Sequence, residues 1–195
     1  AVDFIKEDSD DPFAIVASYH APHDQGAERH DITGPNRFET IPELMNLYDS
    51  DRISLRPNTE WIAGSFGSSL EEIRADFHGY YAMTSGVDKA VGQIVKALKE
   101  KGVYENTIIV YTSDHGDLLH SHGRPWARVP LIVSYPNKIK QSKVSNTLIG
   151  TLDLMPTVLG LMDVKIPKNC IGSDLSKTIT RKRDIEVASV PLFYF

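Results

Sequence analysis

The most informative stretch of this sequence is Thr107-Ile108-Ile109-Val110-Tyr111-Thr112-Ser113-Asp114-His115-Gly116. Its first part is mostly β-branched or aromatic, and a short apolar run bounded by polar residues is typical of a buried β-strand. Asp114 and His115 follow directly, where that strand would end. Ligands of open α/β sheets bind beyond the carboxyl ends of the strands, so these two side chains are candidates for a binding site.

Further elements follow from the pattern on either side of this stretch. Residues 13–19 and 129–135 are apolar runs of similar length, and we expect both to be buried strands. Apolar residues recur at steps of three and four over 77–101, which predicts an amphipathic helix that ends at Gly102. A second helix is predicted over 153–161. Doubly apolar strands that alternate with helices indicate an α/β architecture with helices on both faces of the sheet.

The remaining segments have weaker patterns. Residues 24–69 are rich in Pro, Gly, Asn and charged residues, and we expect a long irregular excursion there, of the kind that is usually functional. Residues 177–195 form a tail without an assigned element. The N-terminus lacks both an initiator Met and a signal pattern, so we expect residues 1–195 to be part of one domain in a longer protein.

The composition argues against several kinds of partner. Acidic residues number 26 and basic residues 21, and the net charge of −5 does not suggest nucleic acid or an anionic membrane surface. No stretch reaches the roughly 18 apolar residues needed to cross a bilayer. The single cysteine, Cys170, excludes an intrachain disulfide and does not identify the redox compartment.

Two pairs of polar residues are candidates for chemistry. The Asp114 carboxylate is a hard oxygen ligand suited to Ca²⁺ or Mg²⁺, and the neighbouring imidazole of His115 can ligate or donate a hydrogen bond. A bare Asp-His-Gly tripeptide is also typical of a structural turn. His20 and His23 form the second pair, and they either share one sheet edge or are surface histidines in a loop.

A third candidate is the set of histidines His115, His120 and His122. Their closeness in sequence is compatible with a transition-metal cluster. However, no Cys lies nearby and no helical His-x-x-x-His is present, which favours a hard cation over zinc. The sequence also contains no phosphate-binding Gly-x-x-x-x-Gly-Lys loop and no Gly-x-Ser-x-Gly elbow.

Several segments together resemble, in order, motifs of the sulfatase family of the alkaline-phosphatase-like superfamily. They are residues 19–23 (Tyr-His-Ala-Pro-His), 53–58 (Ile-Ser-Leu-Arg-Pro-Asn), 80–88, 106–116, 122–123, 128–133, 153–159 and 172–175. The resemblance covers roughly residues 13–176 and corresponds to the C-terminal part of the family's catalytic domain. It implies a three-layer α/β/α sandwich around a largely parallel sheet, incomplete in this chain.

The resemblance also implies an activity, the hydrolysis of sulfuric esters of carbohydrates or aryl alcohols. Members of this family use a formylglycine nucleophile and a divalent cation, usually Ca²⁺, with Mg²⁺ as an alternative. Asp114 and His115 are therefore expected to be metal ligands, and His23 is expected to contact the sulfate ester and assist the leaving group. The expected partner is a sulfated small molecule or glycan, and the family suggests an extracytoplasmic location.

The chain also departs from the family pattern. It has no Cys/Ser-x-Pro/Ala-x-Arg motif for the formylglycine, and no counterpart of the family's N-terminal aspartate pair. A sulfate-binding lysine is missing between Gly123 and Arg128, where Arg124 is the candidate substitute. We therefore expect a partial site and no activity from the isolated chain. Because unpaired apolar sheet edges promote aggregation, we also expect the chain to need the missing N-terminal part of the same domain.

Two alternative functions remain open. A phosphodiester or phosphonate monoester hydrolase of the same superfamily would share the Asp-His-Gly signature, since sulfate and phosphate esters have similar shapes. A non-catalytic remnant that binds sulfated glycans would use His23, Asp114, His115 and Arg124 to hold an anion without turnover. The nucleophile of the full-length protein distinguishes the first alternative: a formylglycine motif favours a sulfatase, and an unmodified Thr or Ser favours a phosphoester hydrolase. An aryl-sulfate assay distinguishes the non-catalytic remnant from an enzyme.

Overall fold

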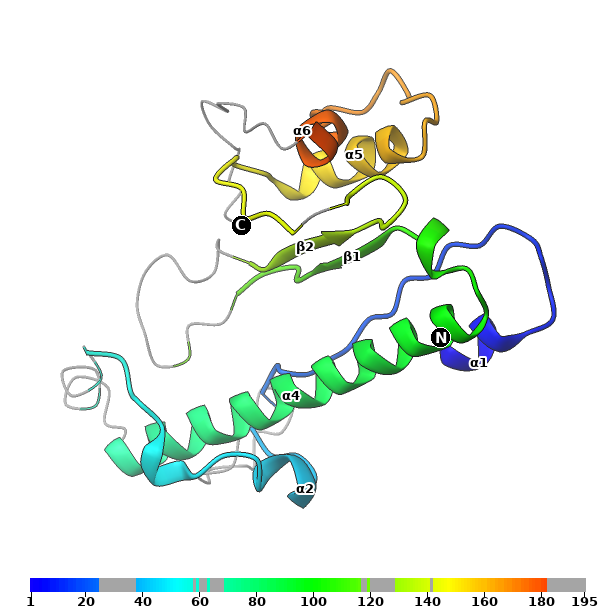
Figure 1. Ribbon diagram of the computed structural model, residues 1–195. Coiled ribbons are helices and arrows are strands. Elements are labelled where there is room, and N and C mark those ends of the chain that lie inside the picture. Colours follow the sequence, from blue (N-terminus) through cyan, green and yellow to red (C-terminus); the bar gives the residue numbers. More distant parts are fainter. Residues whose placement is uncertain are drawn as a thin grey trace. The chain divides into compact units, whose positions relative to one another are not determined.

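The structure, a computed structural model, describes residues 1–24, 38–57, 59, 63, 69–116, 119, 129–140 and 142–181. The chain divides into two compact units. The helical unit contains residues 1–101 and 116–126, and the sheet unit contains residues 102–115 and 127–195. Figure 1 shows the helices and strands of each unit. Within the described ranges, no helix combines the length and apolar character needed to cross a membrane.

One long helix, α4 (Leu70–Glu100), organises the helical unit. The Ser69 hydroxyl accepts the Glu72 backbone N–H at 3.1 Å, and the Glu72 carboxylate accepts the Ser69 N–H at 2.7 Å. This capping box satisfies donors that a helix start otherwise leaves unpaired. Gly102 follows the helix with φ +78°, a backbone conformation that favours glycine. The predicted helix and its end are confirmed, but the helix begins at Leu70 rather than near residue 77, because the Ser69-x-x-Glu72 capping box sets its start.

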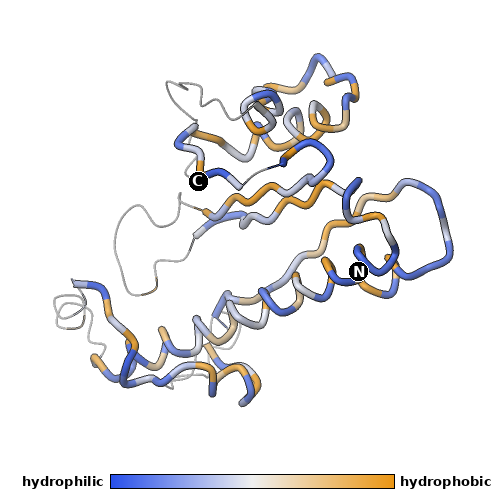
Figure 2. The backbone as a smooth tube through the Cα atoms, viewed as in Figure 1, coloured by the Kyte–Doolittle hydropathy of each residue, from blue (hydrophilic) through white to orange (hydrophobic). Residues whose placement is uncertain are grey.

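The core of the helical unit lies against the N-terminal half of α4. Its buried apolar side chains are Phe38, Ile53, Ile73, Phe77, Met83 and Leu119. Gly79 allows a close approach on this face, because a Cβ there would lie 1.6 Å from the carbonyl oxygen of Phe38. Figure 2 shows hydrophobic and hydrophilic residues alternating along α4, as a helix with one buried face requires.

Short helices flank α4 on either side of this core. α2 (Pro42–Met45) and η1 (Ser50–Arg52) pack against it, and they lie in the part of the predicted 24–69 excursion that the structure describes. α1 (Val2–Lys6) packs against α4 as well, with Ile5 buried. The Lys6 ammonium lies 3.7 Å from the Glu100 carboxylate, so this contact is made near the C-terminal end of α4.

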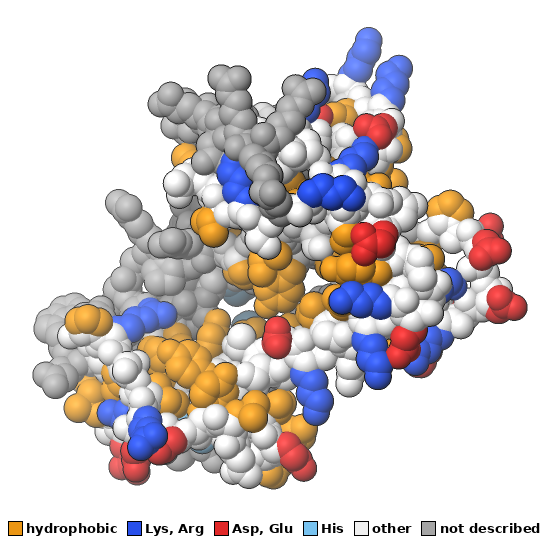
Figure 3. Space-filling model, in the orientation of Figure 1, with side chains coloured by type: hydrophobic (Ala, Val, Ile, Leu, Met, Phe, Trp, Pro, Cys, Tyr) orange, Lys and Arg blue, Asp and Glu red, His pale blue; other side chains and the backbone are white. Residues whose placement is uncertain are grey.

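The predicted buried strand over residues 13–19 is wrong for the described structure. This segment is neither helix nor strand and is exposed along its whole length, with Val16 95% exposed. Its backbone makes no hydrogen bond to any other described residue. A strand needs a neighbouring backbone to pair with, and an apolar pattern alone does not provide one. Hydrophobic side chains also reach the surface on the face of the molecule shown in Figure 3.

The sheet unit contains two strands, β1 (Ile109–Thr112) and β2 (Leu131–Ser134). They pair antiparallel, with Ile109 opposite Ser134 and Thr112 opposite Leu131. Both strands were predicted. Antiparallel pairing agrees with a connection that lacks the helical pattern of a crossover between parallel strands. No parallel neighbour of this pair occurs among the described residues, so the largely parallel sheet is not visible there.

The remaining helices of the sheet unit are held together around Asp153. This residue ends η4 (Thr151–Asp153) and directly precedes α5 (Leu154–Leu161), which confirms the helix predicted over 153–161. Its carboxylate accepts the backbone N–H of Gly150 at 2.9 Å and that of Ser173 at 2.7 Å. α6 (Ser176–Arg181) packs on α5 and includes the start of the unassigned tail, whose residues 182–195 lie outside the described part.

Candidate active site

Asp114 and His115 lie immediately after β1, as predicted. The Ser113 hydroxyl donates to the carbonyl oxygen of His115 at 2.6 Å, and the His115 backbone N–H donates to Asp114 Oδ1 at 2.9 Å. These two bonds hold the backbone in a turn. The side chains of Asp114 and His115 are 86% and 59% exposed, so solvent reaches both.

The electrostatic environment favours a charged carboxylate at Asp114. The hydrogen bond from the His115 backbone N–H is the main cause that lowers the pKa of Asp114, and the nearby His115 side chain adds to it. Hydrogen bonds to the ionised form stabilise that form. Asp114 is therefore an anionic oxygen donor at neutral pH.

The doublet fits a divalent cation as part of a site. Asp114 Oδ2 lies 3.7 Å from His115 Nε2, close enough for one cation to contact both atoms. The carboxylate is the oxygen ligand that Ca²⁺ prefers, at about 2.3–2.6 Å, and the imidazole would add a nitrogen. Calcium takes about six to eight ligands, more than two side chains supply. Among the described residues, no group of three or more His, Cys, Asp or Glu side chains is arranged for a metal. The three-histidine alternative is untested, because His120 and His122 lie outside the described residues.

His20 and His23 come together in the helical unit, at a turn rather than at a sheet edge. The His23 backbone N–H donates to the His20 carbonyl at 2.9 Å, and the two ring centroids are 5.0 Å apart. His23 Nδ1 lies 2.8 Å from the Asp24 carbonyl oxygen. A carbonyl can only accept, so Nδ1 is the donor of this bond and Nε2 is the nitrogen left for another partner.

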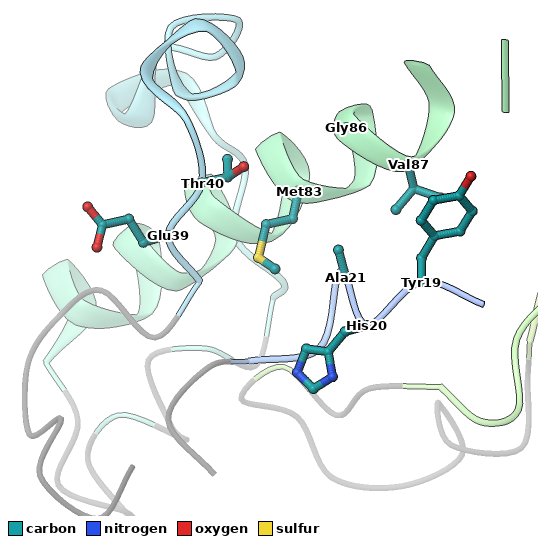
Figure 4. A pocket seen from close by; sticks show the side chains of 8 residues that line it. All are labelled: Tyr19, His20, Ala21, Glu39, Thr40, Met83, Gly86 and Val87. Atoms are coloured by element: carbon teal, nitrogen blue, oxygen red, sulfur yellow. The ribbon is translucent and has the colours of Figure 1, made fainter. Parts of the chain in front are cut away.

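A cavity of about 330 Å³ opens beside these histidines, within the helical unit. Figure 4 shows that its walls come from three segments: α4, the chain before the α2 helix, and the turn that contains His20. The residues that line it are Tyr19, His20, Ala21, Glu39, Thr40, Met83, Gly86 and Val87. Sequence reasoning missed this cavity, because only the fold brings these segments together.

The predicted site residues thus fall into two local groups. Asp114 and His115 form one group in the sheet unit, and His23 lies with His20 in the helical unit. Arg124 lies outside the described residues. Ser113 was not singled out from the sequence, although a hydroxyl directly before an Asp-His turn is well placed to bond the turn backbone.

Known proteins match this chain over most of its length. A family model described as Sulfatase matches residues 1–164. An ulvan-active sulfatase of Formosa agariphila is 32% identical over 181 residues, which are 87% of this chain and 32% of that protein. An endo-4-O-sulfatase of Bacteroides thetaiotaomicron is 32% identical over 183 residues, 87% of this chain and 33% of that protein.

Solved structures agree with these matches. A Bacteroides fragilis protein assigned as a sulfatase superposes with a TM-score of 0.75 at 29% identity, covering 94% of this chain and 40% of that one. In sequence, the chain spans about a third of the length of the two curated relatives, the ulvan-active sulfatase and the endo-4-O-sulfatase.

Proposed function

This chain belongs to the sulfatase family and has the alkaline-phosphatase-like fold of its structural neighbours, and from this premise we propose that it is part of a metal-dependent sulfuric ester hydrolase. The substrate class is a sulfated carbohydrate or an aryl sulfate. The observation that carries the proposal is the anionic, exposed Asp114 beside His115 at the end of β1.

Asp114 and His115 are the residues of this chain that would hold the divalent cation. The ion, Ca²⁺ or alternatively Mg²⁺, would offset the negative charge on the sulfate oxygens. The hydrogen bond from the His115 N–H keeps Asp114 ionised, so the carboxylate need not lose a proton before it ligates. Further ligands come from the rest of the protein.

His23 would act on the leaving group. Its Nδ1 is bonded to the Asp24 carbonyl, which orients the ring and leaves Nε2 to donate a proton to the departing oxygen. Arg124 would add positive charge for the sulfate. The nucleophile, a formylglycine, is expected elsewhere in the full-length protein, because no motif for its formation occurs in these 195 residues. The isolated chain should therefore lack activity.

The names of two relatives support a glycan substrate. One is an ulvan-active sulfatase and the other an endo-4-O-sulfatase. The proposed macromolecular partner of the chain is the N-terminal part of the same domain. Segment 13–19 is the surface it would cover, because it is apolar, exposed and makes no backbone hydrogen bond to the other described residues, and such a segment is suited to pairing with another strand.

The test is hydrolysis of 4-nitrophenyl sulfate by the full-length protein with and without a chelator. Asp114→Asn keeps the shape of the side chain and removes its charge, and it should reduce kcat/KM by about a hundredfold or more. Asp88→Asn, on the exposed side of α4, is the matched control and should have no effect. If Asp114→Asn and Asp88→Asn behave alike, Asp114 is not a ligand. Faster cleavage of a phenyl phosphonate ester than of the sulfate would favour the phosphonate hydrolase instead.

A further inference from the structure

Ser113 is a half-buried residue between two exposed ones, Thr112 at the end of β1 and Asp114. Where a strand ends, the backbone loses its ladder partners, and side chains or water must take their place. The Ser113 hydroxyl does so by donating to the His115 carbonyl oxygen at 2.6 Å. This separation is at the short end of the range for a hydroxyl donor, as expected of a well-formed hydrogen bond.

The backbone of His115 is thereby held at both of its polar groups. Its carbonyl accepts the Ser113 hydroxyl, and its N–H donates to Asp114 Oδ1 at 2.9 Å. Ser113 Oγ also lies 3.3 Å from Asp114 Oδ1, but a hydroxyl has a single proton and the carbonyl is the nearer acceptor. Ser113 therefore holds the carbonyl of His115 and Asp114 holds its N–H, and neither bond replaces the other.

This backbone decides where the two proposed metal ligands lie. The side chains of Asp114 and His115 are 86% and 59% exposed, which leaves little packing to order them. The separation of 3.7 Å between Asp114 Oδ2 and His115 Nε2 depends instead on the turn from which both side chains project. Ligands on a backbone that is already fixed lose less conformational entropy when they bind. A hydroxyl that fixes the turn therefore raises the affinity of the pair for a cation without contacting the ion.

We propose that Ser113 is a positioning residue of the cation site, which acts through the turn that presents Asp114 and His115. The inference rests on the proposed function, because these two residues are metal ligands only within it. The requirement is a hydroxyl donor at this position, which threonine supplies and alanine does not. Groups that orient metal ligands typically change the metal affinity about 10–100-fold when they are removed.

The experiment uses the full-length protein after a chelator has removed bound metal. Calorimetric titrations with Ca²⁺ and, separately, Mg²⁺ give the Kd of each ion, and hydrolysis of 4-nitrophenyl sulfate is followed against the calcium concentration. Ser113→Ala removes the hydroxyl, Ser113→Thr keeps it, and Ser113→Cys replaces it with a weaker donor of similar shape. Ser134→Ala is the matched control, because Ser134 lies opposite Ile109, at the end of the β1–β2 pair that is far from the turn.

We expect Ser113→Ala to raise the Kd about tenfold or more and Ser113→Cys to raise it by a smaller factor, while Ser113→Thr and Ser134→Ala stay within about twofold. Excess calcium should restore kcat in Ser113→Ala, since a saturating ion orders the turn. A loss of folded protein would instead lower the rate at every calcium concentration. Melting curves of the metal-free variants establish which are folded, and Ser113→Cys takes the place of Ser113→Ala if the latter is not.

The proposal is overturned if Ser113→Ala binds the cation as tightly as Ser134→Ala, if Ser113→Thr binds it as weakly as Ser113→Ala, or if the unmodified protein binds neither ion. Hydrolysis that requires Asp114 but has the same calcium dependence in Ser113→Ala would keep the proposed function and reject the role of Ser113. Cation binding that depends on Ser113, without hydrolysis of the sulfate ester by the unmodified protein, would reject the proposed function and keep this role.

Discussion

Asp114 Oδ1 accepts the backbone N–H of His115 at 2.9 Å, and this single bond is the main reason why the pKa of Asp114 is lowered. The geometry keeps a candidate metal ligand charged without burying it. The same bond joins the two candidate ligands, so the turn orders them as a pair.

The first prediction concerns the titration of Asp114. The pKa of Asp114 is lower in the folded protein than the ordinary value of 3.8. The charged carboxylate therefore adds fully to the stability of the folded state above pH 3.8, and this contribution is lost as the pH falls through the lowered pKa. Carboxyl ¹³C NMR of the full-length protein, with Asp114 assigned through Asp114→Asn, should give a midpoint below 3.8. A midpoint at or above that of a model peptide would contradict the hydrogen-bond argument. Protonation of Asp114 should accordingly not weaken calcium binding above about pH 5.

The second prediction tests whether the N-terminal part of the domain packs against residues 13–19 in the full-length protein. Val16 and Val144 are 95% and 90% exposed, so in this chain alone an aspartate should be tolerated equally at both positions. If a strand of the full-length protein covers Val16, Val16→Asp buries a charge there and lowers the free energy of unfolding by about 3 kcal/mol. Val144→Asp should stay within about 0.5 kcal/mol, the usual range for surface changes. Urea denaturation of both full-length variants measures these free energies of unfolding. Equal losses for Val16→Asp and Val144→Asp would refute the proposed interface.

The third prediction concerns Asp153, which joins α5 to the segment before α6. Asp153→Ala leaves the N–H groups of Gly150 and Ser173 without their acceptor, and we expect a loss of about 1–3 kcal/mol. Asp153→Asn keeps one acceptor and should lose less. Glu105→Ala, an exposed acidic residue in the same unit, is the control. Denaturation midpoints in which Asp153→Ala equals Glu105→Ala would show that these bonds contribute nothing.

Sequence reasoning worked where the pattern is local. The apolar run at 107–112 predicts a strand, and the structure has β1 there with Asp114 and His115 directly after it. The helix that ends at Gly102 was predicted for the same reason. Its apolar periodicity and its terminal glycine are both features of residues that are close in sequence.

It failed where the outcome depends on a partner in space. Residues 13–19 have the same apolar character as β1, but no described backbone pairs with them. The cavity and the contact of His20 with His23 depend on a turn and on helix packing, neither of which leaves a periodic signal. The sequence also does not predict where two backbone segments approach closely. A glycine within a helical pattern reads the same whether or not another segment of the protein packs against it.

The fourth prediction compares Gly79 and Gly92 of α4, because only at Gly79 does another backbone segment approach the helix closely. A Cβ at Gly79 would lie 1.6 Å from the Phe38 carbonyl oxygen, whereas a Cβ at Gly92 would meet nothing within 4 Å. Alanine is favoured over glycine in a helix by about 1 kcal/mol, so Gly92→Ala should stabilise the protein by up to that amount. Gly79→Ala gains the same propensity but must push the 38–40 segment away from α4, and it should destabilise by about 2 kcal/mol or more. Thermal and urea unfolding of the two full-length variants measure both effects. Stabilisation by both substitutions would mean that Phe38 does not pack against α4 as described.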